Sequence, residues 1–219
     1  MSQTVSAREQ ILAAIRGAKP APATDSTSTP RPTLQLTSPP DDPDTSIERF
    51  MSLAREEAAT AERVAEAADV PRAVLRYLRS ERLSLRLIIA GNARISGIVW
   101  ESTADLDCAA EPVADDGDTV VTGCYAGVAE AGAVVTLSSS DHPSEFNFLA
   151  ATHIVIVPAS VVVDSFEQLW PRLRADYPER WPRMMNFIVG PSRTADLGVP
   201  SRLGAHGPSR VHIIVVDSC

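Results

Sequence analysis

The stretch Ile154-Val155-Ile156-Val157 is apolar at four consecutive positions and is followed by Pro158. A strand with one face in solvent alternates apolar and polar residues, whereas a strand buried on both faces is apolar throughout, as in parallel sheets. We therefore predict a buried parallel strand here. Further short runs rich in apolar and β-branched residues lie at 85–90, 119–122, 133–137, 186–189 and 211–216, and we predict strands at each of them.

Three segments between or before these runs have the 3.6-residue spacing of helices. The first runs over 45–67 and opens with the capping pattern Thr45-x-x-Glu48, the second runs over 69–78, and the third runs over 164–173, where Pro171 should bend it. Strands alternating with helices predict an α/β fold, with a mostly parallel sheet flanked by helices on both faces. Ligands of such folds bind beyond the carboxyl ends of the strands.

The chain before residue 45 has a different character. Residues 6–17 have the pattern of a short amphipathic helix, and seven prolines fall between Pro20 and Pro43 among Ser, Thr and Asp. Such a composition cannot bury a core. We expect a helix within 1–19, a linker over 20–44 and an α/β domain over 45–219. Because so short a helix is marginal alone, we expect it to dock on the domain or on a neighbouring subunit.

Composition excludes several classes of protein. The formal charge of −8 and a pI near 5.0 disfavour nucleic acid and anionic membranes as partners. No apolar run reaches the roughly 20 residues of a spanning helix, and we expect a cytoplasmic protein. The three cysteines (Cys108, Cys124 and Cys219) form no C-x-x-C pair. We therefore expect no iron–sulfur cluster, metal or other cofactor in this chain.

The first candidate loop spans 122–132, Thr-Gly-Cys-Tyr-Ala-Gly-Val-Ala-Glu-Ala-Gly, directly after a predicted strand. Thr122 and Gly123 are candidate ligand-binding residues, because glycine lets the backbone approach a ligand closely. Glu130 is a candidate catalytic carboxylate. The alternative is that Glu130 caps a helix or faces solvent at a turn.

The second candidate loop, 190–196, reads Gly-Pro-Ser-Arg-Thr-Ala-Asp and also follows a predicted strand. Arg193 could clamp a carboxylate or a phosphate. The alternative is a well-bonded turn in which Ser192 caps a short helix and Arg193 pairs with Asp196. The candidate ligand-binding residues here are Gly190, Ser192, Arg193, Thr194 and Asp196.

The third candidate loop, 204–208, reads Gly-Ala-His-Gly-Pro before the last predicted strand. Histidine titrates near neutrality, so His206 is a candidate for proton transfer, and Gly207 a candidate ligand-binding residue. The alternative is a turn residue bonded to backbone. His142, in the polar loop 138–143, is a weaker candidate, and we interpret His153 and His212, at or inside predicted strands, as structural. Neither Ser192 nor Cys124 stands in the chain order of a catalytic triad.

These loops together resemble the lactate-utilisation (LUD) domain family, of the protein C type (LutC/YkgG). The resemblance covers about residues 45–217 and rests on Thr122-Gly123 with Glu130-Ala131-Gly132, on Thr152-His153-Ile154-Val155, and on the loops at 190–196 and 204–208. It implies a sheet like that of the NagB/RpiA/CoA-transferase-like superfamily. It also implies a part in oxidising L-lactate to pyruvate beside two iron–sulfur partner proteins.

Two positions depart from the family pattern. Ala133 stands where the family usually has Thr, and Gly198 stands where it usually has Glu. A paralogue with altered or lost activity therefore stays open.

Three functions are consistent with these patterns. The first is a component of a lactate-oxidising system whose three loops form a pocket for a small carboxylate or a phosphate-bearing ligand. The second is a non-catalytic assembly or regulatory subunit, which could be a homo-oligomer. The third is a coenzyme A or acyl transferase that uses Glu130, whose place loosely resembles that of the transferases' glutamate. Whether the chain is an enzyme is left open.

Overall fold

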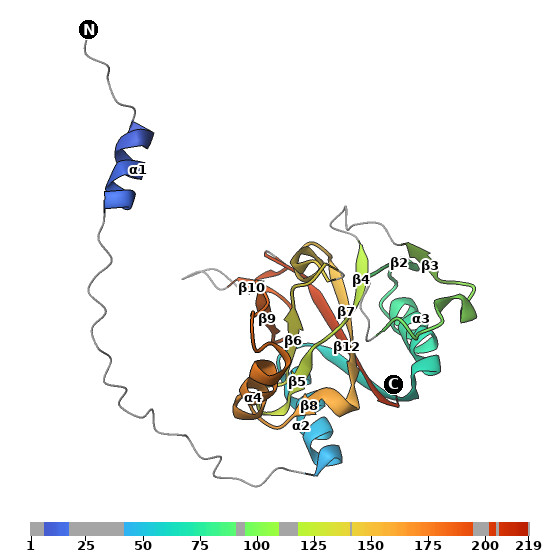
Figure 1. Cartoon of the computed structure of the whole chain (residues 1–219). Coiled ribbons are helices and arrows are strands. Elements are labelled where there is room, and N and C mark those ends of the chain that lie inside the picture. Colours follow the sequence, from blue (N-terminus) through green and yellow to red (C-terminus); the bar gives the residue numbers. More distant parts are fainter. Residues whose placement is uncertain are drawn as a thin grey trace. The chain divides into compact units, whose positions relative to one another are not determined.

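A computed structural model describes residues 7–17, 42–90, 95–109, 118–140, 142–194, 202–204 and 206–218 (Figure 1). The chain divides into two compact units, residues 1–38 and 39–219. The first contains the helix α1 (Ala7–Gly17), on which Ile11 and Leu12 are exposed. The helices of the second unit are α2 (Pro43–Glu56), α3 (Val70–Ser80) and α4 (Phe166–Asp176).

Six parallel strands form the main sheet of the second unit. Their order is β1-β12-β7-β4-β2-β3, and every neighbouring pair is parallel. The strand predicted from the apolar run at 154–157 lies inside this sheet and is buried at all seven of its positions. The strands are β1 (Thr60–Glu66), β12 (Arg210–Ser218), β7 (Thr152–Pro158), β4 (Thr119–Gly123), β2 (Arg86–Ile89) and β3 (Asp107–Ala109).

A second sheet of four strands is mixed rather than parallel. Its order is β8 (Val162–Val163), β5 (Ala126–Val128), β6 (Ala133–Leu137) and β9 (Met185–Ile188). Only β5 and β8 are parallel, while β6 is antiparallel to both of its neighbours. The short strands β10 (Arg193–Thr194) and β11 (Arg202–Leu203) form a separate antiparallel pair. The predicted parallel character therefore belongs to the main sheet alone.

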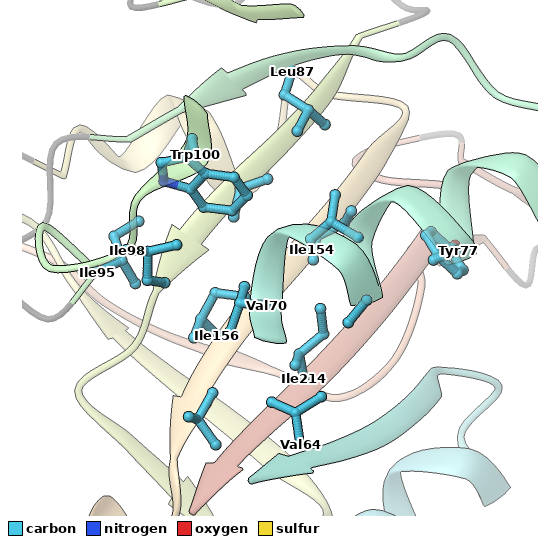
Figure 2. Packing of buried hydrophobic residues seen from close by; sticks show 14 of the residues in the cluster. Val64, Val70, Tyr77, Leu87, Ile95, Ile98, Trp100, Ile154, Ile156 and Ile214 are labelled. Atoms are coloured by element: carbon cyan, nitrogen blue, oxygen red, sulfur yellow. The ribbon is translucent and has the colours of Figure 1, made fainter. Parts of the chain in front are cut away.

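Both faces of the main sheet are covered, but by different layers. On one face α3 packs Val70, Val74 and Leu78 against Ile154, Ile156 and Ile214 of the central strands (Figure 2). On the other face lie Phe50 and Ala54 of α2, together with Val134 of the second sheet and Ala129 of the turn between β5 and β6. Each fully buried aliphatic side chain contributes about 1.5–3 kcal/mol, so these two layers supply most of the driving force for folding.

The helix predicted over 45–67 is wrong at both ends. Asp42, whose side chain accepts from the Asp44 N–H, precedes the first turn, and α2 ends at Glu56. Ala58 then adopts a left-handed backbone with φ of 66°, which stops the helix. The residues that follow form β1, which pairs in parallel with β12 over Thr60–Glu66. Pairing with a central strand thus overrides the helical spacing of the alanines.

None of the helices in the described parts of the chain is long and apolar enough to cross a membrane.

Candidate functional site

The turn containing His206 and Gly207 lies at the amino edge of the main sheet. It leads into Ser209, whose N–H donates to the Ala151 carbonyl at 2.9 Å, and Arg210 pairs with Thr152 where β12 and β7 begin. Parallel strands begin at a common edge. The turn therefore lies at the amino ends of the strands, whereas ligands of such folds bind beyond the carboxyl ends.

The second candidate loop lies against this turn. The Ser192 N–H donates to the Pro208 carbonyl at 2.8 Å, and the Gly204 N–H donates to the Ser192 carbonyl at 2.9 Å. Arg193 pairs with Leu203 across the β10–β11 ladder, and its side chain is exposed. The two loops thus form one polar surface. The alternative interpretation, in which Ser192 caps a short helix, is wrong, because the next two residues form the strand β10.

Beneath this edge, Thr122 contacts a fully buried histidine. Thr122 Oγ1 lies 2.8 Å from Nε2 of His153, and both side chains are inaccessible to solvent. Burial, together with the nearby His142, lowers the pKa of His153 from 6.5 to about 3. The imidazole is therefore neutral at physiological pH. His153 is the second residue of β7, two residues after the Ala151 that anchors the His206 turn.

His142 extends the cluster. Its Nε2 lies 3.4 Å from the amide oxygen of Asn147, whose nitrogen donates to Thr136 Oγ1 at 3.0 Å. Because an amide oxygen only accepts, the proton of His142 belongs on Nε2, and Nδ1 is left as an acceptor. Burial lowers the pKa of His142 as well, more than the Asn147 bond raises it.

Among the described residues, Nδ1 of His142 and Nδ1 of His153 have no hydrogen-bond partner. A buried polar atom without a partner costs about 1–3 kcal/mol. A group that donated to or accepted from these nitrogens would remove that cost. The interpretation of His153 as a satisfied structural histidine is therefore incomplete. Thr136 and Asn147, which complete the cluster, belong to no sequence motif.

Glu130 lies apart from this cluster, in a 3-10 turn at Ala129–Ala131. Its Oε1 accepts from the Phe166 N–H at 2.8 Å, at the first residue of α4, and its own N–H donates to the Asp164 carbonyl at 2.9 Å. The helix-capping alternative thus describes the geometry of Glu130, whose side chain is exposed.

The backbone after Glu130 and the second candidate loop both approach the carboxyl end of α2. Gly132 packs on Ala54, and Gly190 packs on Glu57 just after the helix. The two candidate loops at 190–194 and 204–208 are joined by hydrogen bonds, whereas the carboxylate of Glu130 is engaged by the start of α4.

The remaining candidates are placed as follows. Gly123 ends β4 opposite Ile156, toward the carboxyl side of the sheet. Gly190 has φ of 71° beside Glu57. Thr194 belongs to β10, and Asp196 lies outside the described residues, as does Gly198. No group of three or more His, Cys, Asp or Glu side chains suited to a metal ion occurs within the described ranges.

The fold and this edge define an α/β protein with a parallel main sheet and a polar, histidine-containing cluster at its amino edge. The chain belongs to the LUD domain family, whose model matches residues 47–216. It resembles a crystal structure of a DUF162 family protein from Deinococcus radiodurans with a TM-score of 0.57 and 21% identity, over 81% of this chain and 99% of that one. At this identity the likeness supports the fold alone.

Several curated relatives are similar over part of their length. A Lactate utilization protein C of Macrococcus caseolyticus (strain JCSC5402) is 35% identical over 107 residues, which is 48% of this chain and 46% of the relative. One from Bacillus subtilis (strain 168) is 32% identical over 54% of this chain and 50% of the relative. The Escherichia coli (strain K12) protein YkgG is 28% identical over 57% of this chain and 54% of the relative. The matches thus span about half the length of these relatives.

Proposed function

We propose that the chain is a component of a lactate-utilisation system, in which L-lactate is oxidised to pyruvate together with iron–sulfur partner proteins. The support is its membership in the LUD domain family and its similarity to relatives named Lactate utilization protein C. With three widely spaced cysteines, this chain has no motif for a cluster, and the proposal assigns the electron-carrying clusters to the partners.

In this proposal the joined loops at the amino edge bind a small carboxylate such as lactate or pyruvate, or a phosphate-bearing ligand. Arg193 supplies a cation that can bind a carboxylate through two hydrogen bonds, and it is exposed to incoming ligand. His206, in the adjoining turn, is the candidate for proton transfer. The observation that carries this site is the pair of backbone hydrogen bonds that hold Ser192 against the 204–208 turn.

Thermal unfolding of the purified chain with L-lactate, pyruvate, coenzyme A and sugar phosphates tests the site. A ligand at 100 times its dissociation constant stabilises by about 2.7 kcal/mol, which a melting curve resolves. We expect lactate or pyruvate to raise the Tm of the wild type and of Arg180→Ala, an exposed arginine outside the site, but not of Arg193→Ala. An equal shift in all three proteins would refute the role of Arg193, and no shift with any compound would refute the ligand site.

A non-catalytic assembly subunit is a second candidate, and one observation favours it. Four large apolar side chains on or next to the edge strand β9 are exposed by 39–47%: Trp181, Met184, Phe187 and Val189. Exposed apolar groups that gather in one region mark contact surfaces. Acyl transfer by Glu130 has less support, because its carboxylate is engaged with the start of α4.

A further inference from the structure

Three side chains on β1 and β12 form a second polar cluster, separate from the candidate site. Thr60 lies directly opposite His212 in the parallel register, and Thr60 Oγ1 is 2.8 Å from Nδ1 of His212. Glu62, two residues further along β1, projects to the same face as Thr60. Its Oε1 lies 3.2 Å from Nε2 of His212. A hydroxyl, an imidazole and a carboxylate are thus connected in series.

The carboxylate determines which nitrogen of His212 carries the proton. An ionised carboxylate can only accept, so Nε2 of His212 is the donor, and Nδ1 of the neutral ring is the acceptor for the Thr60 hydroxyl. Burial alone would raise the pKa of Glu62, but the hydrogen bonds from His212 and Arg76 outweigh burial and lower it. Glu62 therefore stays ionised, and this tautomer is the stable one at neutral pH.

The imidazole is held rigidly while the hydroxyl faces solvent. His212 is only 4% exposed, and its ring stacks on Tyr77 of α3 with centroids 3.9 Å apart and planes 6° apart. Figure 2 shows Tyr77 beside β12. Thr60, in contrast, is exposed. A buried base with a fixed ring orientation thus lies under an accessible hydroxyl.

Two other groups can accept from the Thr60 hydroxyl. The Val211 carbonyl lies 3.5 Å away, farther than His212 Nδ1 at 2.8 Å. Burial raises the pKa of Tyr77, whereas its hydrogen bond with Thr60 lowers it, which is the effect of a hydroxyl that donates to the phenol oxygen. The charged groups nearby are Glu62, Arg76, Glu81 and Arg210.

We propose that Thr60 is a nucleophile that accepts an acyl group from an activated ester or thioester, with His212 as its general base and Glu62 as the residue that positions the base. A nucleophile bonded to a base, which is in turn oriented by a third group, is the arrangement that activates serine, cysteine and threonine side chains. The chain order and strand pairing differ from known triads, but the roles depend on geometry alone.

The reaction has two balanced steps. Thr60 Oγ1 attacks the carbonyl carbon while its proton passes to Nδ1 of His212. The bond from that carbon to the leaving oxygen or sulfur breaks, and the leaving group takes the proton from His212, which gives a free alcohol or thiol and an acyl ester on Thr60. Water then attacks the ester, its proton passes to His212, and Thr60 leaves with that proton as a carboxylic acid is released.

The test uses the full chain with p-nitrophenyl acetate, followed by release of nitrophenolate and by peptide mass spectrometry. We expect one acetyl group on the peptide that contains Thr60. Thr60→Val and His212→Gln should lower the rate at least about 100-fold, whereas Thr60→Ser should retain it. Thr45→Val, an exposed threonine on α2, serves as the matched control and should react as the wild type.

Glu62→Gln distinguishes positioning from a purely structural role. Loss of the carboxylate should lower the maximal rate and leave the KM for the ester unchanged, because Glu62 orients the base and does not touch the substrate. Absence of acetyl-Thr60 in wild type quenched with acid during the first turnover, before water can release the acyl group, overturns the proposal even if a variant fails to fold. Equal rates of nitrophenolate release for Thr60→Val and the wild type also overturn the proposal. The exposed Cys108 is the competing nucleophile, and peptide mapping separates its adduct from that of Thr60.

Discussion

At the scale of single residues, His153 couples stability to pH. The unfolded chain binds a proton at this side chain below about pH 6.5, whereas the folded chain does so only near pH 3. Between these values the unfolded state holds more protons, so the free energy of unfolding falls as the pH falls. Above pH 6.5 the His153 side chain is neutral in the folded and the unfolded chain, so it no longer makes stability depend on pH. The lowered pKa of His142 acts in the same direction.

We therefore predict that His153→Gln flattens the acid limb of the stability profile. Glutamine can still bond to Thr122 but does not titrate. Between pH 6 and pH 4, the free energy of unfolding of the variant should therefore fall by about 1.4 kcal/mol less per pH unit than that of the wild type. Urea unfolding at each pH from 4 to 8 measures this. The two profiles should run parallel from pH 7 to 8, and parallel profiles below pH 6 as well would contradict the assignment.

Sequence patterns located part of the candidate site but could not assemble all of it. Residues 190–194 and the turn that ends at Pro208 lie side by side because the Ser192 N–H donates to the Pro208 carbonyl, a contact between neighbouring loops in the chain. The group of Thr60, Glu62 and His212 was not foreseen. His212 lies about 150 residues after Thr60 and Glu62 along the chain, and only the pairing of β1 with β12 brings it to them.

At the scale of elements, two glycines allow loops to pack against the end of α2. Gly132 has φ of 58°, and a Cβ there would lie 2.3 Å from the Ala54 nitrogen. Gly190 has φ of 71°, and a Cβ there would lie 2.0 Å from the Glu57 carbonyl oxygen. No side chain fits at such distances. The second sheet is thus docked on α2 by backbone contact.

We predict that Gly132→Ala lowers the free energy of unfolding by at least about 2 kcal/mol. The left-handed backbone alone costs alanine roughly 1–2 kcal/mol, and displacement of α2 adds to it. Gly97→Ala is the matched control, because a Cβ at Gly97 meets nothing within 4 Å. Urea denaturation of the two variants gives the comparison. Equal free energies of unfolding for Gly132→Ala and Gly97→Ala would contradict the prediction and would show that α2 can move away from Gly132 without loss of stability.

Apolar runs predicted four strands of the main sheet (β2, β4, β7 and β12) and two of the second sheet (β6 and β9), but short or ambivalent elements were missed. β3, β5 and β8 contain only three, three and two residues, too few for any periodicity to emerge. The segment 58–66 has alanines at helical spacing, and nothing local opposes a helix there until β12 offers a partner strand. Alanine is compatible with both helix and strand, so the pairing with β12 determines the conformation of this segment. A local sequence pattern carries no information about that pairing.

At the scale of the whole molecule, β9 presents a sheet edge. Within the described strands it has β6 on one side and no strand on the other. Phe187 packs edge-on against Phe166 and Trp170, with ring centroids 5.4 and 6.1 Å away, yet it stays 39% exposed. Unpaired backbone groups beside apolar side chains are a template for another strand. Two copies pairing through β9 in antiparallel fashion would form a closed, two-fold contact.

We predict that the chain dimerises through this edge. Sedimentation velocity at micromolar concentration should show a dimer for the wild type and a monomer for Phe187→Glu, because a charge at the centre of an apolar contact must lose its hydration. Met184→Glu should act in the same way without touching the Phe166 and Trp170 rings. Phe148→Glu changes a phenylalanine outside β9 that is 46% exposed, against 39% for Phe187, and this variant should remain dimeric. A monomeric wild type, or dissociation by Phe148→Glu alone, would contradict pairing through β9 and would weaken the assembly-subunit interpretation.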